Sequence, residues 1–146
     1  MAKTIKDIVK DLTLLTSSID QLLASADYET YDDLSGIDVN YDDADELYLL
    51  NEARAMIDKL ADISRTIKYL KQPIISEGLL HRKSNGRYEL NGQELSCGQE
   101  IEYLTSDAFY DSPYWCYGVI EHNGTDYYIV GANVELEGLR VRIRKK

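Results

Sequence analysis

Acidic side chains crowd one stretch of the chain, residues 27–46, which contains no lysine or arginine. This stretch contributes about -9 of the formal net charge of -10, so the rest of the chain is nearly neutral. Carboxylates without neighbouring cations attract basic surfaces, and tyrosines among them add rigid contact area of the kind enriched at interfaces. The alternative for the tyrosines is that they fold back onto adjacent helices. We predict partner-binding residues at Asp32, Asp33, Asp38, Asp42, Asp43, Asp45, Glu46, Tyr31 and Tyr41.

One part of the acidic stretch looks like the start of a calcium-binding loop. Asp38-x-Asn40-x-Asp42 places oxygen atoms at alternate positions. A helix-loop-helix calcium site also needs glycine at its sixth position and a bidentate glutamate at its twelfth. Asp43 and Leu49 stand there, so the loop can neither turn nor close around calcium in that manner. We expect no metal site of this type.

Histidines and cysteines are too dispersed to predict a metal centre or an activated nucleophile. Cys116 and His122 are six residues apart, whereas structural zinc sites usually present their ligands in close pairs. Nothing in the spacing brings Cys97 or a serine to a histidine and an orienting acid, and no phosphate loop or dinucleotide motif is present. We expect a protein that is not an enzyme and needs no cofactor, with both cysteines as packing residues.

The overall charge limits the class of partner. Lysine and arginine number 16 against 26 aspartates and glutamates, and binding to nucleic acid depends on cations that displace counterions from phosphates. A basic protein surface is therefore the expected partner. The alternative is direct nucleic-acid binding by the C-terminal run of Arg140, Arg142, Arg144, Lys145 and Lys146. We favour an edge strand protected from aggregation by its charges, although these cations are also placed to neutralise part of the acidic stretch.

Two helices precede the β-rich half. Apolar residues recur in steps of three and four from Thr4 to Ala26, which predicts one amphipathic helix, with Thr4 and Asp7 forming a capping box. A second helix is predicted from Asp43 to Lys71, and Pro73 prevents its continuation. Their apolar stripes need a partner, so we expect an antiparallel helical hairpin over residues 1–72, with the acidic connection at residues 27–46.

The sequence pattern of residues 73–146 is typical of short strands separated by turns. Asn85-Gly86, Asn91-Gly92 and Asn123-Gly124 are strong hairpin signals because both residue types tolerate positive φ. Alternation of apolar and polar side chains predicts strands around residues 78–82, 87–90, 101–104, 114–121, 126–130 and 139–144. Five or six short strands in about 70 residues suggest a small closed antiparallel barrel of SH3-like type. The predicted class is α+β.

The N-terminus gives no sign of export. Charges recur every few residues, unlike a signal peptide, and no run approaches the roughly 18 apolar residues of a membrane span. We expect a cytoplasmic protein whose Cys97 and Cys116 are free thiols, because a reducing compartment does not maintain disulfides.

Four segments of the β-rich half carry a resemblance to a known family: GRYELNGQELSCG at 86–98, IEH at 120–122, DYYIVG at 126–131 and LEGLRVRIR at 136–144. Over roughly residues 78–144 the chain resembles an uncharacterised domain of unknown function found on plasmids, conjugative elements and phages of low-GC Gram-positive bacteria. That family brings no known activity or site residues. The helical half lies outside the resemblance.

The resemblance implies a setting, a bacterial host cell that carries a mobile element. Small acidic proteins in that setting are often counter-defence factors, which include inhibitors of CRISPR nucleases and proteins that imitate DNA. We therefore expect an anti-CRISPR-like, non-enzymatic inhibitor whose acidic stretch occupies the cationic, PAM-reading surface of a Cas9-type nuclease. The alternative is a nucleic-acid-binding or regulatory accessory of a mobile element that uses the basic C-terminal strand.

Overall fold

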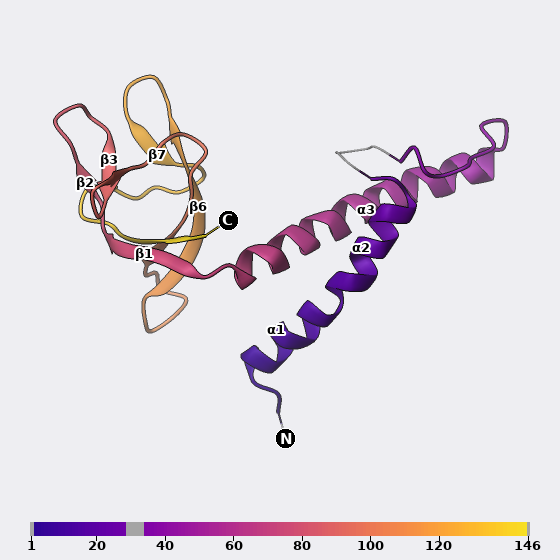
Figure 1. Ribbon diagram of the computed structural model, residues 1–146, viewed down its shortest axis with the longest axis horizontal. Helices are drawn as coiled ribbons and strands as arrows, with labels where there is room; N and C mark the ends of the chain where they lie inside the picture. Colours follow the sequence, from indigo (N-terminus) through magenta and orange to yellow (C-terminus); the bar gives the residue numbers. More distant parts are fainter. Residues whose placement is uncertain (1, 29–33, 146) are drawn as a thin grey trace. The chain divides into compact units, whose positions relative to one another are not determined.

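The protein contains helices in its first half and antiparallel sheets in its second (Figure 1). The structure, a computed structural model, describes residues 2–28 and 34–145. The chain divides into two compact units, Met1–Lys71 and Gln72–Lys146. The α+β class is confirmed. Among the described helices, none is both long enough and apolar enough to cross a membrane.

The helix predicted from Thr4 to Ala26 is bent. Its first part, α1, is Ile5–Leu14, and its second part, α2, is Thr16–Ser25. The capping box of Thr4 and Asp7 is present as predicted. The bend follows Thr13, whose hydroxyl donates to the carbonyl of Val9 at 2.9 Å, a side-chain bond that competes with the helical ladder and bends helices. The apolar pattern continues through the bend, so it could not predict the interruption.

Helix α3, Ala44–Lys71, begins and ends close to the predicted positions. Asp45 and Glu46 lie in its first turn and Lys68 and Lys71 in its last, so the charges complement the helix dipole at both ends. Helices α2 and α3 run antiparallel, because Asp20 meets Ser64 and Lys68 at 2.9 and 3.2 Å whereas Tyr28, further along the first helix, meets the earlier residue Asp58 at 3.0 Å. The predicted helical hairpin is confirmed.

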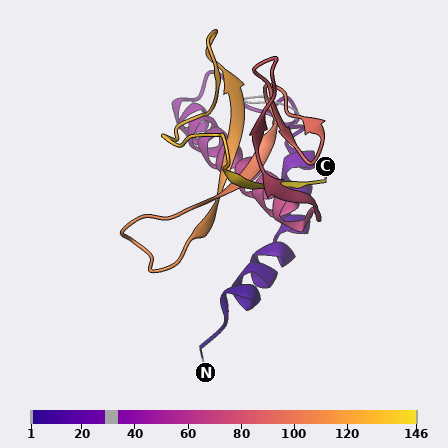
Figure 2. The ribbon, with the colours of Figure 1, turned by 90° about the vertical axis from the view of Figure 1, so that its left-hand side faces the viewer.

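The β unit contains one five-stranded and one three-stranded antiparallel sheet. The larger sheet has the order β1-β8-β5-β6-β7, formed by β1 Ile74–Leu79, β8 Arg140–Arg144, β5 Glu100–Thr105, β6 Tyr114–His122 and β7 Tyr127–Ile129. The smaller sheet has the order β2-β3-β4, formed by β2 His81–Arg82, β3 Tyr88–Leu90 and β4 Gln93–Glu94. The connection between β5 and β6 projects away from the strands (Figure 2).

All three Asn-Gly pairs lie in hairpin turns of the β unit. Asn85-Gly86 joins β2 to β3, Asn91-Gly92 joins β3 to β4, and Asn123-Gly124 joins β6 to β7. Asn91 and Gly92 both have positive φ, 52° and 86°, which is the conformation that two-residue hairpin loops require. These local predictions are confirmed.

The two sheets share one apolar core, but neither sheet closes on itself among the described residues. The short β2–β3–β4 strands form their own sheet and do not join β1 to β7, the two ends of the larger one. The predicted SH3-like closed barrel is therefore not confirmed. Fully buried side chains come from both sheets and the adjoining loops: Leu80, Leu90, Ile101, Ile120, Ile129 and Val141.

Strand β8 carries the basic run, and its predicted place at a sheet edge is wrong. It lies inside the larger sheet, between β1 and β5. Alternation of apolar and basic residues predicted a half-buried strand correctly, since Val141 is fully buried. Alternation describes two faces of a strand and carries no information about how many neighbours pair with it.

Candidate functional site

Hydrogen bonds hold two of the carboxylates at the start of α3, those of Asp43 and Glu46. One oxygen of Asp43 accepts from the backbone N–H groups of Asp45 and Glu46, at 2.9 and 3.4 Å, and so caps the helix. The Asn40 side chain accepts from the N–H of Asp42 at 3.1 Å, and the Asn40 N–H donates to Glu46 at 3.3 Å. The turn from the connection into α3 is thus tied by its own acidic side chains.

Apolar residues of the connection attach it to the helical hairpin. Leu34 is buried in the cluster that includes Ala26, Leu50 and Ile57, and Ile37 and Val39 pack against the same cluster. Asp38 stands between Ile37 and Val39 and is exposed. This alternation directs the carboxylate outward while its neighbours face the core.

Gly36 allows the connection to lie directly on the end of α2. Its N–H donates to the carbonyl of Ala26 at 2.9 Å. A Cβ at this position would come within 2.7 Å of the Ala26 backbone carbon and 2.8 Å of the Asp27 nitrogen, closer than real Cβ atoms approach backbone. Only glycine therefore fits this contact without moving the connection.

The described carboxylates of the connection and of the start of α3, together with the adjacent tyrosine, form what we call the acidic patch: Asp38, Tyr41, Asp42, Asp43, Asp45 and Glu46. Tyr41 is 70% exposed, and Asp42 and Asp45 are exposed at the start of the helix. Within residues 2–28 and 34–145, no salt bridge joins an acid of the patch to a lysine or arginine. Tyr31, Asp32 and Asp33, also predicted as partner-binding residues, lie outside the described residues.

The two described tyrosines of the acidic stretch have different environments. Tyr28 folds back onto the hairpin, and its hydroxyl donates to Asp58 at 3.0 Å. Burial, followed by that hydrogen bond, raises the pKa of the Tyr28 phenol. Tyr41 extends into solvent. The sequence left open whether these tyrosines are exposed contact residues or fold back onto the helices. Tyr41 is exposed and Tyr28 folds back.

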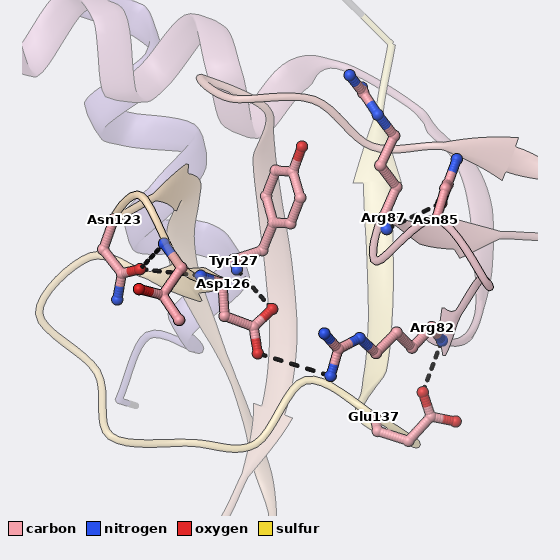
Figure 3. Close-up of polar contacts among 8 residues, drawn as sticks. Arg82, Asn85, Arg87, Asn123, Asp126, Tyr127 and Glu137 are labelled. Atoms are coloured by element: carbon pink, nitrogen blue, oxygen red, sulfur yellow. Dashed lines mark hydrogen bonds and ion pairs between the residues drawn. The ribbon is translucent and has the colours of Figure 1, made fainter.

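Arginines of the β unit contrast with the acidic patch, because each of them has an acidic partner. Figure 3 shows Arg82 directed toward Asp126, at 3.9 Å, while its backbone N–H donates to Glu137 at 2.6 Å. Just before β3, Arg87 lies 3.9 Å from Glu94. These surface pairs are worth little in stability, but they neutralise the cations locally.

The three arginines of β8 are also paired. Arg140 contacts Glu77 of β1 at 2.5 Å. Arg142 and Arg144 both contact Glu102 of β5, at 2.5 and 2.7 Å. These cations were expected to neutralise part of the acidic stretch, but the ion pairs of the three arginines among the described residues join them to Glu77 and Glu102, on the two strands that flank β8.

Glu102 is the centre of this ionic network and was not identified from the sequence. It is 5% exposed, and the guanidinium of Arg142 also lies 4.2 Å from the centre of the Trp115 ring. Burial raises the pKa of Glu102, but hydrogen bonds from Arg144 and Arg142 outweigh that effect and hold the pKa below its ordinary value. In the sequence, Glu102 stands between Ile101 and Tyr103 in a predicted strand. This pattern is only a weak indication of a buried ion pair.

A second surface missed by the sequence analysis is the aromatic loop at residues 106–113, between β5 and β6. Phe109 is 82% exposed, and the rings of Phe109, Tyr110 and Tyr114 form edge-to-face contacts with centroids 5.1 and 5.0 Å apart. An open pocket of about 400 Å³ is lined by residues 110–114. The Tyr114 hydroxyl donates to Asp107, which raises the pKa of Tyr114 to about 12.

The histidines and cysteines lie apart and have ordinary surroundings. Cys97 is exposed and Cys116 is half-buried, and both are free thiols. His122 accepts a hydrogen bond from the N–H of Gly124 at 3.0 Å, in the β6–β7 turn. In the part of the chain that the structure describes, no three His, Cys, Asp or Glu side chains are arranged to hold a metal ion.

Comparison with known protein families finds one match, and it lies within the β unit. Residues 77–143 match the model of a family described as "Domain of unknown function (DUF5348)". Neither a curated protein nor a solved structure shows significant similarity to the chain. The match includes β8 as far as Ile143 and its acidic partners Glu77 and Glu102, and it excludes the helical hairpin with its acidic patch. The chain therefore carries a DUF5348 domain in its β-rich half.

Proposed function

We propose that this protein is a non-enzymatic inhibitor of a nucleic-acid-targeting defence nuclease, of the Cas9 type, in the cytoplasm of a bacterial host cell. In this proposal the acidic patch imitates DNA and binds the cationic surface with which the nuclease reads its target. One observation supports it most strongly. The carboxylates of the patch have no cationic partner among the described residues, whereas every arginine of the β unit is paired.

The chemistry of such a target fits this arrangement. Cas9-type nucleases hold nucleic acid in a positively charged channel and read the PAM with two arginines. Asp42, Asp43, Asp45 and Glu46 offer four carboxylates within one short segment, and hydrogen bonds of the helix start hold part of that segment in place. A preorganised array loses less conformational entropy on binding than a flexible acidic tail.

Exposed aromatic rings add contact area beside the charges. Tyr41 and Tyr48 are 70% and 63% exposed and flank the acids in the sequence. Tyrosine is enriched in protein interfaces because it combines a large apolar ring with a hydrogen-bonding hydroxyl. We expect the acids to govern the rate and salt dependence of association, and the tyrosines to lengthen the lifetime of the complex.

A cleavage assay tests the proposal. Target DNA is cut by a Cas9-type nuclease with increasing amounts of the protein, or of a variant with Asp42→Asn, Asp43→Asn, Asp45→Asn and Glu46→Gln. The asparagine at position 43 retains a capping side chain, so the helix start persists while the charge is lost. We expect the inhibitory concentration to rise at least about tenfold, or about 1.4 kcal/mol.

The matched control removes four carboxylates from the β unit, with Glu89→Gln, Asp111→Asn, Glu121→Gln and Glu135→Gln. It changes the net charge by the same amount and leaves the acidic patch intact. If both variants inhibit equally, the patch is not the binding surface. If the unmodified protein inhibits no CRISPR or restriction nuclease, the proposed class of function is wrong.

Direct nucleic-acid binding by the basic strand is the competing proposal. Arg140, Arg142 and Arg144 are engaged by Glu77 and Glu102, so binding phosphate would require these ion pairs to open. An electrophoretic mobility-shift titration at several salt concentrations separates the two functions. A steep salt dependence that is lost on Arg140→Ala would favour nucleic-acid binding over the acidic patch.

A further inference from the structure

The aromatic loop between β5 and β6 displays large rings in solvent. Phe109 and Tyr110 are 82% and 57% exposed, and the loop projects away from the strands (Figure 2). Apolar groups that are exposed together, rather than singly, mark interaction sites. These rings also support one another, because Tyr110 makes edge-to-face contacts with both Phe109 and Tyr114. The loop therefore presents an aromatic surface that is partly ordered before any partner arrives.

The open pocket of about 400 Å³ in this loop combines aromatic walls with a carboxylate. The ring planes of Tyr110 and Tyr114 stand at 65° to each other. Asp111 is an exposed residue of the lining and lies between the two tyrosines in the sequence. We call this pocket the loop pocket, and its lining consists of Tyr110, Asp111, Ser112, Pro113 and Tyr114.

A second carboxylate, that of Asp107, adjoins the loop pocket. It accepts hydrogen bonds from the hydroxyl of Tyr114 and, at 2.8 Å, from the N–H of Phe109. These bonds hold the pKa of Asp107 below its ordinary value, so this carboxylate is charged at neutral pH. Within residues 2–28 and 34–145, neither Asp107 nor Asp111 forms a salt bridge. The loop therefore carries two negative charges without a cation of its own.

Cations of the β unit are committed elsewhere. The sequence contains no lysine or arginine between Arg87 and Arg140, so the aromatic loop and both of its strands lack basic residues. The arginines of β8, the strand beside β5, are engaged by Glu77 and Glu102. The charge of the loop pocket is thus complementary to a cation supplied from outside the chain.

The β unit already contains the same combination of groups with an arginine in place. The guanidinium of Arg142 lies 4.2 Å from the centre of the Trp115 ring, and its Nε contacts the carboxylate of Glu102 at 2.5 Å. A guanidinium suits such a setting because it is planar, stacks on aromatic faces and donates to carboxylates. The loop pocket offers the rings and the carboxylate without the arginine.

We propose that the loop pocket binds an arginine side chain of a partner protein. The guanidinium packs against the rings of Tyr110 and Tyr114 and donates to the carboxylate of Asp111, while Asp107 adds negative charge nearby. Arginine fits better than lysine, because an ammonium group is more strongly hydrated and cannot stack as a plane. The two carboxylates also oppose binding of a nucleic-acid phosphate at this surface. This site belongs to the β unit and depends neither on the acidic patch nor on the proposed inhibition of a nuclease.

Nuclear magnetic resonance of the full chain labelled with nitrogen-15 tests the proposal. The probe is the peptide acetyl-Gly-Arg-Gly-amide. We expect the backbone amide signals of the aromatic loop to shift and to saturate at millimolar peptide, since one exposed cation–π contact with one ion pair is weak. A peptide with citrulline in place of arginine keeps the planar shape without the charge and is expected to bind at least about tenfold more weakly. A lysine peptide is expected to bind about threefold more weakly than the arginine peptide.

A double variant, Tyr110→Leu with Asp111→Asn, removes one ring and one charge from the loop pocket. We expect its affinity for the arginine peptide, followed at the loop amides, to fall at least about tenfold. The matched control is Tyr128→Leu with Glu121→Gln, which removes one ring and one charge from paired positions of β7 and β6. This control is expected to leave the titration of the loop unchanged.

Four results would overturn the proposal. Loop amides that do not shift up to the solubility limit of the arginine peptide would mean that the pocket takes no such side chain. Equal binding of the citrulline peptide would mean that charge is not recognised, and equal binding of the lysine peptide would mean that ring stacking is not. Equal affinities of the double variant and its control would place the bound peptide elsewhere, for example on the acidic patch.

The amide signals of Ile101 and Ile120, which are buried in the core of the β unit, show whether each variant keeps its fold. If the double variant does not, Asp111→Asn alone takes its place, because this position is exposed and the substitution preserves its shape. The arginine peptide is then expected to bind about threefold more weakly to the loop, and an unchanged affinity would overturn the role of Asp111.

Discussion

At the scale of single residues, Glu102 shows how the β unit tolerates a buried charge. It is the one buried charged residue within residues 2–28 and 34–145. An isolated carboxylate in such a position would be costly, but Arg142 and Arg144 each donate a hydrogen bond to a different oxygen of it. The three side chains come from β5 and β8, so this network and the pairing of those strands support each other.

Glu102→Gln tests the strength of the network. The substitution preserves shape but removes the counter-ion of two largely buried arginines, so we expect the free energy of unfolding to fall by about 3 kcal/mol. Urea denaturation measures the change. Glu94→Gln is the matched control. Because Glu94 pairs with Lys83 at the surface, where solvent screens the charges, this substitution should cost much less than Glu102→Gln. Similar losses in the two variants would contradict a special role for the buried network.

The same network predicts a dependence on pH. The pKa of folded Glu102 lies below its ordinary value of 4.5, so the folded state binds a proton less readily than the unfolded state. Its contribution is therefore complete above about pH 4.5 and is lost as pH falls through the lowered pKa. We expect the stability difference between the unmodified protein and Glu102→Gln to shrink below that pH in urea titrations. A constant difference down to strongly acidic pH would contradict this assignment.

At the scale of elements, the start of α3 combines a structural role with the proposed binding role. Asp43 satisfies two N–H groups that the helix itself leaves unpaired. Its carboxylate is also one of the negative groups proposed to face a partner. Because capping needs an oxygen acceptor and binding needs a charge, substitutions at one position can separate the two roles.

Asp43→Ala removes both roles, and Asp43→Asn removes only the charge. We expect Asp43→Ala to lower the free energy of unfolding by about 1 kcal/mol, and Asp43→Asn by a few tenths. Chemical denaturation followed by far-UV circular dichroism provides the measurement. Asp42→Ala is the control because, among the described residues, the hydrogen bonds of the helix start are accepted by the side chains of Asn40 and Asp43 and not by that of Asp42. A loss in Asp43→Asn as large as in Asp43→Ala would mean that charge, not capping, supports the helix.

At the scale of the whole molecule, each unit has its own apolar core. Ala26, Leu34, Leu50 and Ile57 form the buried cluster of the helical unit. Ten buried residues between Leu80 and Val141 form the cluster of the β unit. Hydrogen bonds that tie Gln72 and Pro73 to Arg144 and Lys145 belong to the β unit alone. The interactions that define each fold are therefore internal to it.

We expect a fragment of residues 72–146 to fold by itself. Its core, both sheets and the Glu102 network are all retained, since the five-stranded and three-stranded sheets lie entirely within it. Thermal unfolding followed by circular dichroism should show one cooperative transition with a β-type spectrum. A fragment that unfolds without a transition would mean that the β unit depends on the helices.

Much of the local structure could be predicted because it depends on neighbours in the sequence. The Thr4–Asp7 capping box, the end of α3 before Pro73 and the three Asn-Gly turns all involve contacts within a few residues. The bend after Thr13 was missed because the apolar repeat passes through it unchanged. For the candidate site, charge and position at a helix start were predictable, whereas partners for those charges were not.

By itself, the sequence determined where α1 starts and where α3 starts and stops, where hairpins turn and where negative charge gathers. Only the tertiary structure decided that β8 lies inside a sheet, that Glu102 neutralises Arg142 and Arg144, and that Tyr28 folds back while Tyr41 stays exposed. The physical reason is the range of the interactions. Caps and turns are closed by adjacent residues, but Glu102 and Arg142 are 40 residues apart, and chain folding must bring them together before either charge is satisfied.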